Sequence, residues 1–348
     1  MFCPTRIWSG RLCALALLVM LSAKAWAQDA AISQPPLPNA YSLSAAPDAV
    51  RAPPATEPFA DRASWTTSAS ESIPECGDCP PGNGWLDNLS FFAGLDGSKQ
   101  PQDFGVNAQF GGRASVNWGI PLFESLGIGA QIGTAIDATG DAVQVVQRTL
   151  GSSGRTQSYT TLGIYQRTEM GLSWGVVYDF LSQGYYDQFA LAQWRVNVGY
   201  QLTERDLVGV WSAIADRSSN GNFGAIPVTL TPITQTNAYY RHEWINGIQT
   251  TGWCGLANEH GQVNAVLGDL APLHDTFVFG AELYVPLTNN LALFGQGNFI
   301  MPASSGTVDA YLGVAWYPHG GVRQMARALF APLQTVAAPT NFAVNLHR

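Results

Sequence analysis

Apolar and polar residues alternate along most of the chain after residue 85. In one stretch Phe110, Ala114 and Trp118 share a face, whereas Arg113 and Asn117 share the opposite face. A period of two maintained over about ten residues is typical of a β-strand with unlike faces and is incompatible with an amphipathic helix. This part of the chain is therefore predicted to be all-β.

Followed along the chain, this alternation predicts twelve strands. They cover residues 88–95, 106–118, 126–136, 157–167, 171–179, 189–200, 205–215, 236–245, 249–257, 275–285, 290–300 and 307–317. No helical period interrupts them, which argues against βαβ folds and their dinucleotide sites.

The connections between these strands alternate between long and short. In chain order they hold 10, 7, 20, 3, 9, 4, 20, 3, 17, 4 and 6 residues. Short turns at one end and long loops at the other are typical of transmembrane barrels, and Asn246-Gly247 favours a tight hairpin. We therefore predict an up-and-down antiparallel β-barrel of about twelve strands.

Tryptophans gather near one end of the predicted strands. With the first strand running outward, six of them fall near the short turns, where an aromatic girdle would meet a membrane interface. They are Trp85, Trp118, Trp174, Trp244, Trp253 and Trp316.

The face of mixed polarity is predicted to line the lumen. Its charged residues are four cations and four anions, Arg113, Arg167, Arg195, Arg241, Asp179, Glu243, Glu282 and Asp309. Unpaired buried charge is costly, so equal numbers favour pairing across the interior. The set fits either a structural network that closes the bore or the lining of a narrow pore. Its mid-strand members, expected to form the narrowest ring, are Arg113, Arg195, Arg241 and Glu282.

The remaining segments are predicted from composition. Residues 1–27 combine two arginines, a ten-residue apolar run and Ala25-Trp26-Ala27, the features of a cleaved export signal. Residues 28–84 hold 10 of the 21 prolines and are predicted to be a disordered spacer. The barrel is assigned to 85–318 and a tail to 319–348. A net charge of −8, with 46% hydrophobic and 12% charged residues, argues against nucleic-acid binding and supports an exported barrel.

Candidate chemistry is sparse. Cys76 and Cys79 lie in the exported part of the chain and are expected to form a small disulfide loop. No metal-ligand spacing, nucleophile elbow or phosphate loop occurs, so we predict no catalytic, cofactor or metal site. Two alternatives stay open: a secreted soluble β-sandwich that binds a ligand through long loops, and a hydrolase on the barrel rim.

Three stretches, Phe91–Asn107, Gly112–Pro121 and Val308–Gly313, carry a resemblance. They resemble an uncharacterised family of exported planctomycete proteins, with a likeness covering roughly residues 86–320. The resemblance implies an outer-membrane barrel-like fold with no assigned activity, so no functional residues are carried over. One departure from ordinary outer-membrane barrels is that 31 residues follow Trp316-Tyr317. Within this tail a short stretch is expected to form an amphipathic helix under the barrel or a solvated peptide; its residues are Arg323, Met325, Arg327, Leu329 and Phe330.

Together these features predict a non-catalytic outer-membrane barrel, either structural or porin-like with a narrow pore. Its expected partners are the lipid bilayer and small ions or solutes.

Overall fold

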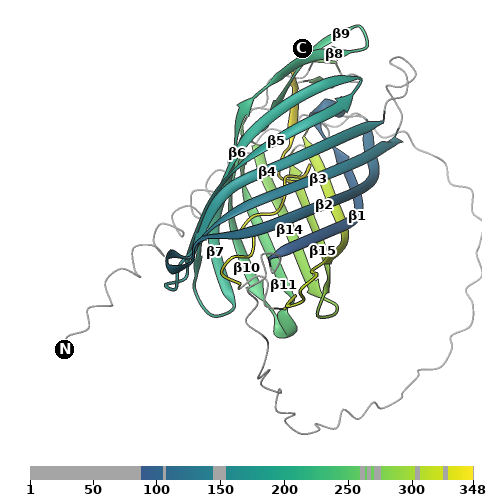
Figure 1. Cartoon of the computed structure of the whole chain (residues 1–348). Coiled ribbons are helices and arrows are strands. Elements are labelled where there is room, and N and C mark those ends of the chain that lie inside the picture. The colour runs from purple at the N-terminus through teal and green to yellow at the C-terminus, as the bar shows by residue number, and fades with distance from the viewer. Residues whose placement is uncertain are drawn as a thin grey trace, which may run out of the picture. The chain divides into compact units, whose positions relative to one another are not determined.

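The computed structural model describes residues 88–104, 107–143, 154–258, 263–264, 268–269, 276–301, 306–323 and 328–347. Twelve strands in this part of the chain form one closed antiparallel sheet (Figure 1). They are β1 (Leu89–Lys99), β2 (Ala108–Phe123), β3 (Ile128–Val143), β4 (Arg155–Arg167), β5 (Leu172–Tyr185), β6 (Asp187–Gln201), β7 (Asp206–Arg217), β10 (Gln235–Glu243), β11 (Gln249–Ala257), β14 (Thr276–Pro286), β15 (Leu291–Ile300) and β16 (Thr307–Trp316). Each corresponds to one predicted strand, so the up-and-down barrel is confirmed and the β-sandwich alternative is wrong.

The sheet closes where the first barrel strand pairs with the last. β1 pairs with β16, with Leu95 opposite Leu312, and every other barrel strand pairs with its neighbours in chain order. Closure leaves no unpaired edge within the ring. The chain enters β1 and leaves β16 at the same end of the barrel, which we call the short-turn end; the opposite end is the long-loop end.

Turns at the short-turn end are compact. They include two single-turn 3-10 helices, η2 (Glu124–Leu126) and η3 (Ile245–Gly247). Within η3, Asn246 and Gly247 have φ of 70° and 76°. The loop holds three residues, because Glu243 pairs with Gln249 and the backbone amide of Trp244 donates to the carbonyl of Ile248 at 2.7 Å. Asparagine and glycine adopt the positive φ that such tight loops require. The predicted tight hairpin at Asn246-Gly247 is therefore confirmed.

Several strands extend further toward the long-loop end than predicted. β3 continues to Val143 rather than 136, and β5 reaches Tyr185 rather than 179. A single residue, Tyr186 with φ of 59°, then connects β5 to β6. Small and polar residues dominate these extensions, so alternation of hydrophobicity no longer reveals them although backbone pairing continues.

The outer face of the barrel is apolar. On β3, Ile132 is 45% exposed whereas its neighbour Gln131 is 1% exposed. Other outward residues include Leu95, Phe110, Leu162, Val198, Phe279 and Leu312. An apolar belt around a closed antiparallel barrel is the architecture of an outer-membrane β-barrel, where lipid covers that belt.

This outer face yields a stability prediction. Replacing Ile132 with Arg is expected to lower the free energy of unfolding by about 2–4 kcal/mol, because the guanidinium would lie against lipid hydrocarbon. The matched control is Leu202→Arg in a short turn, also exposed, where the cost is expected to be about 0–1 kcal/mol. Urea titrations in phospholipid vesicles measure both. Equal costs would mean that this face does not contact hydrocarbon.

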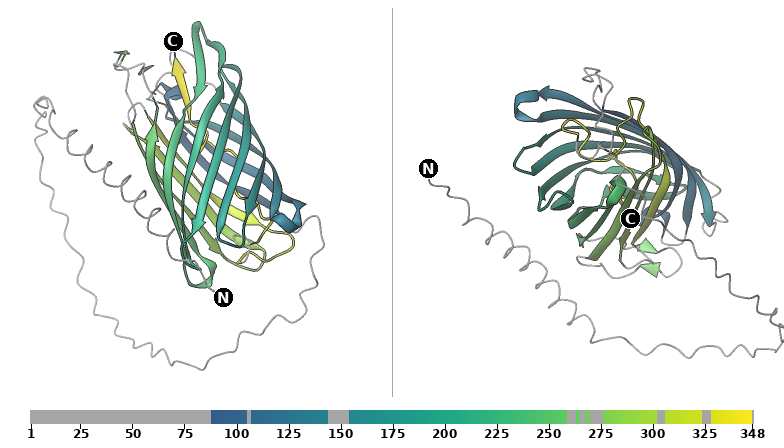
Figure 2. Two further views of the ribbon diagram at one scale, coloured as in Figure 1. Left: turned by 90° about the vertical axis from the view of Figure 1, so that its left-hand side faces the viewer. Right: turned by 90° about the horizontal axis from the view of Figure 1, so that it is seen from below.

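A hydrophobic cluster covers the long-loop end. A 3-10 helix, η1 (Pro101–Asp103), and a hairpin of β8 (Ser219–Phe223) and β9 (Ile226–Pro232) meet there. Phe223 contacts the rings of Phe104, Tyr185 and Phe189 edge-on. The last strand, β17 (Val344–His347), pairs with β9 at this end (Figure 2). The C-terminal residues therefore lie at the opposite end of the barrel from the point where β16 ends.

Candidate functional site

The C-terminal segment passes through the inside of the barrel. Residues 328–347, which we call the luminal segment, follow the inner wall from the short-turn end to β17 (Figure 1). At the short-turn end the hydroxyl of Tyr165 donates to the carbonyl of Phe330. At the long-loop end Val344 lies opposite Pro232 in the pairing of β17 with β9. Residues 324–327 of the predicted amphipathic helix lie outside the described residues. Leu329 and Phe330 are not helical and begin the luminal segment, so the predicted helix is wrong for these two residues.

Glycines on the inner wall make room for this segment. A β-carbon at Gly133 would lie 2.6 Å from Val336 Cγ2, and one at Gly175 would lie 2.9 Å from Leu333 Cδ2. A β-carbon at Gly119 would overlap the carbonyl oxygen of Phe330. Only glycine permits so close an approach of another chain, so the wall is shaped to accept the segment.

Side chains from the wall satisfy the backbone of the luminal segment. Gln131 accepts from the amide of Gln334 at 3.1 Å and donates to the carbonyl of the same residue. Arg195 Nη2 donates to Thr335 O at 2.8 Å, and Arg113 Nη2 donates to Ala337 O at 2.7 Å. The segment has little regular structure, so these bonds replace the ladder that a strand would have.

Three buried ion pairs lie along this wall. Arg113 bonds Asp137 at 2.7 Å, Arg195 bonds Asp179, and Arg155 bonds Asp103 at 3.2 Å. All six side chains are at most 4% exposed. Removing one member of a pair this deeply buried strongly destabilises the fold, because the other member remains as an unpaired buried charge.

Asp103 differs from the other two acids because it lies in η1, beyond the strands. Burial raises the pKa of its carboxyl above the ordinary value, and the guanidinium of Arg155 opposes that shift. The backbone amide of Gln100 also donates to this carboxylate at 2.8 Å. The pair with Arg155 therefore holds η1 against the barrel wall.

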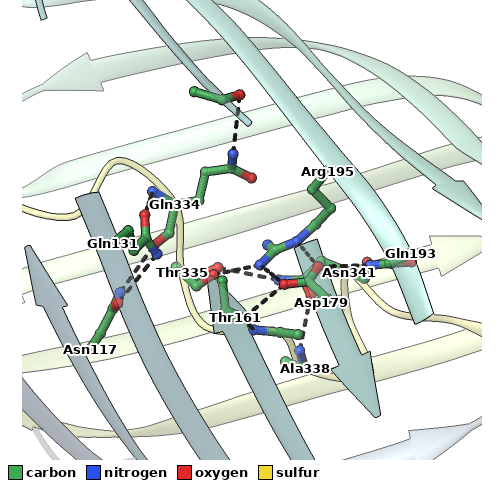
Figure 3. Close-up of polar contacts among 12 residues, drawn as sticks. Asn117, Gln131, Thr161, Asp179, Gln193, Arg195, Gln334, Thr335, Ala338 and Asn341 are labelled. Atoms are coloured by element: carbon green, nitrogen blue, oxygen red, sulfur yellow. Dashed lines mark hydrogen bonds and ion pairs between the residues drawn. The ribbon is translucent and has the colours of Figure 1, made fainter. Parts of the chain in front are cut away.

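Asp179 is the centre of a polar network inside the barrel (Figure 3). It accepts from Thr161 at 2.7 Å, from Gln193 at 3.1 Å and from both donor nitrogens of Arg195. Thr161 in turn accepts from the amide of Ala337 at 3.0 Å. The network thus connects β4, β5 and β6 to the luminal segment.

The other predicted luminal charges lie in different surroundings. Arg241 Nη2 is 3.5 Å from Glu282 Oε1, and Asp309 accepts from Gln100 at 3.1 Å. Arg167, at the short-turn end of β4, donates to carbonyls of the luminal segment, including that of Leu329 at 3.3 Å. Glu243 ends β10 at the same rim, where its amide donates to Arg205 O at 2.8 Å. Arg113, Arg195, Arg241 and Glu282, which were expected to form the narrowest ring, do not form one. Arg241 pairs with Glu282, whereas Arg113 pairs with Asp137 and Arg195 pairs with Asp179.

Sequence reasoning missed Asp103, Asp137 and Arg155. Each lies just beyond the predicted end of a strand or in a predicted loop. Asp137 follows the predicted third strand by one residue and shares a face with Gln131 by simple alternation. Extending that strand by one residue would have placed its carboxylate in the lumen.

Four of the tryptophans predicted to form the aromatic girdle lie on the outer face, and one faces inward. Trp118 and Trp174 are half-buried on the outer face, and Trp244 and Trp316 are exposed there. Trp253 is 7% exposed and faces inward, donating to Asn298 Oδ1 at 2.9 Å, so its assignment to the girdle is wrong. The assignment used the position of this tryptophan along its strand and ignored the face.

Three of the residues singled out from the sequence cannot be placed in the structure. Trp85, Cys76 and Cys79 lie outside the described residues. Within the described ranges no group of three or more His, Cys, Asp and Glu side chains could hold a metal ion. The same ranges contain no helix long and apolar enough to cross a membrane.

The sequence of residues 88–344 matches the model of a family of unknown function (DUF6666). The chain belongs to DUF6666. The matched region begins at the entry to β1 and extends into β17, so the DUF6666 region includes both the barrel and nearly all of the luminal segment. No curated protein matches the sequence.

Solved structures with similar coordinates include three membrane proteins. An outer membrane channel from Pseudomonas putida F1 (COG4313) has 10% identity and a TM-score of 0.48, covering 69% of this chain and 98% of its own. The toluene transporter TbuX of Ralstonia pickettii has 11% identity and a TM-score of 0.40, covering 66% and 89%. Outer membrane phospholipase A from Escherichia coli has 10% identity and a TM-score of 0.37, covering 65% and 95%. Likeness at this level transfers no role, so the function is argued from the residues of this chain.

Proposed function

We propose that this protein is a structural, non-catalytic outer-membrane barrel whose lumen is sealed by its own luminal segment. The observation that carries the proposal is the course of residues 328–347 along the inner wall, bonded to side chains of β2, β3, β4, β6 and β15. A segment bonded at so many points is part of the folded barrel.

The engagement of the luminal charges favours a seal over a porin. Arg113 and Arg195, which would attract anions in an open pore, each bond a carboxylate and a carbonyl of the segment. At the long-loop end Phe342, Val344 and Leu346 join the hydrophobic cluster. Water and ions would have to displace both sets of contacts to cross.

Purified full-length protein in planar lipid bilayers tests this seal. We expect no stepwise current at moderate voltage, because ions would have to displace the luminal segment and the hydrophobic cluster at the long-loop end. A porin of the same strand number, reconstituted in the same lipid, is the positive control. Regular conductance steps from the full-length chain would contradict the seal and support the narrow-pore alternative.

The membrane assignment rests on the apolar outer belt and on the predicted export signal at residues 1–27. Fractionation is expected to recover the protein with outer-membrane lipid, and amino-terminal sequencing is expected to begin at Gln28. Recovery in a soluble fraction without detergent would contradict the assignment. Release of fatty acid from phospholipid vesicles, or of peptides from casein, would contradict the non-catalytic part.

A further inference from the structure

A cavity occupies the part of the lumen that the luminal segment leaves free. Its volume is about 240 Å³, and its lining reaches the short-turn rim at Asn88, Gln249 and Tyr317. The luminal segment is bonded to β2 through β6 and, from Thr340 to Gln296, to β15. The rest of the cavity wall belongs to β1, β7, β10, β11, β14, β15 and β16. The luminal segment therefore leaves a closed-in cavity between itself and these strands.

The polar wall of the cavity carries an ion pair unlike the others. The Arg241 and Glu282 side chains are 31% and 15% exposed and lie 3.5 Å apart, whereas the three pairs described above are almost fully buried. Thr251 accepts from Arg241 Nε at 3.0 Å, and Gln296 Nε2 lies 3.4 Å from Glu282. A donor and an acceptor are therefore presented side by side, with no net charge.

An aromatic wall lies next to this pair. The Tyr239 ring packs over Gly209, where a β-carbon would lie 2.5 Å from Tyr239 Cζ, and the Trp253 ring packs over Gly280 in the same way. Hydrogen bonds to Asn197 at 3.1 Å and to Asn298 at 2.9 Å hold the polar edges of the two rings. Each ring therefore has one face against the wall, and Trp211 lies edge-on to Trp253 with centroids 6.2 Å apart. Both rings line the cavity, where 7% of Trp253 and 9% of Tyr239 are exposed.

We propose that this cavity binds one neutral sugar residue. A pyranose ring has an apolar C–H face that stacks on an aromatic ring and a rim of hydroxyls that both donate and accept. Trp253 and Tyr239 provide the stacking surface. Glu282 accepts hydrogen bonds from sugar hydroxyls, and Arg241 donates hydrogen bonds to their oxygens.

Arg241 and Glu282 neutralise each other, and the other lining cations are engaged as well: Arg113 and Arg195 by carboxylates, and Arg167 by carbonyls of the luminal segment. This engagement disfavours a charged ligand, and the size lies below the ~300 Å³ at which drug-sized pockets begin. The proposal does not depend on whether the lumen conducts.

Binding is tested on the full chain in lauryldimethylamine oxide, since detergents with sugar headgroups would compete. The probes are methyl glycosides of glucose, galactose, mannose and N-acetylglucosamine, titrated by calorimetry, with glutamate and lysine as charged comparators. At least one glycoside is expected to bind saturably and the comparators are not. Trp253→Leu is expected to weaken binding by about tenfold or more, through loss of the stacked ring. The matched control, Trp316→Leu on the outer face, is expected to bind as the unmodified chain does.

A second variant distinguishes recognition of hydroxyls from a general affinity for sugars. Glu282→Gln removes the acceptor charge and leaves Arg241 without its countercharge, so glucuronate is expected to bind this variant better than the neutral glycosides do. Retention of heat-modifiable migration on gels shows that each variant is folded. Absence of glycoside binding to the unmodified chain, unchanged affinity in folded Trp253→Leu, or equal binding of the charged comparators would overturn the proposal.

Discussion

Removing residues 328–348 is expected to turn an electrically silent barrel into one that conducts ions in a planar lipid bilayer. Without the luminal segment, Arg113 and Arg195 lose their carbonyl partners and face a hydrated bore. The free side of the lumen already contains a cavity of about 240 Å³, which would then join the vacated space. Single-channel recording of the truncated and full-length proteins in the same lipid measures the effect.

A point variant tests the same idea with the chain intact. Gly133→Leu would place a side chain where Val336 now lies and is expected to displace the segment and open the lumen. The matched control is Gly252→Leu on the outer face, where a β-carbon meets no atom within 4 Å; it is expected to stay silent. A folded truncated barrel that remains silent would show that the strands and the long-loop cluster close the lumen without the segment.

The second large effect concerns Asp179. Asp179→Ala is expected to lower the free energy of unfolding by about 3–5 kcal/mol, because Arg195 would remain buried without its carboxylate partner. Thr161 and Gln193 would lose the same acceptor. Urea titration in phospholipid vesicles, followed by tryptophan fluorescence, gives the free energy.

Two comparisons separate the charge effect from general damage. In the accessible pair, Glu282→Gln is expected to cost about 0–1 kcal/mol, because solvent screens that contact. The double variant Asp179→Leu/Arg195→Met is expected to recover much of the loss, since no unpaired charge is left. A cost for Asp179→Ala no larger than that for Glu282→Gln would contradict the role assigned to the Asp179 network.

The barrel could be predicted from sequence because one period persists through the chain. Each strand must keep lipid on one side, so apolar residues such as Ile132 and Leu162 repeat at every second position. The pattern fades beyond the apolar belt, so Asp137 and Arg155, which lie there, were not predicted as luminal residues. Trp253 shows a related difficulty: residues next to each other on a strand belong to opposite faces, and an error of one residue changes the assignment from lipid to lumen.

The luminal segment could not be predicted in the same way. Its contacts are mostly between wall side chains and its own backbone carbonyls, such as those of Thr335 and Ala337, and every sequence supplies carbonyls. The one sequence feature that indicated the segment was the presence of glycines on the inner wall. Gly119, Gly133 and Gly175 occupy inward positions where an ordinary barrel interior would have side chains.

The course of the luminal segment also sets the order in which the protein assembles. Contacts such as Gln131 with Gln334 join residues 203 positions apart, so the closing of a very long loop must precede them. The seam between β1 and β16 encloses the segment, which would otherwise have to thread the whole bore. We therefore expect the segment to seat on the open sheet before the seam pairs. Once shut, the seam must break before the segment can leave, so the assembled barrel is expected to persist because its unfolding is slow.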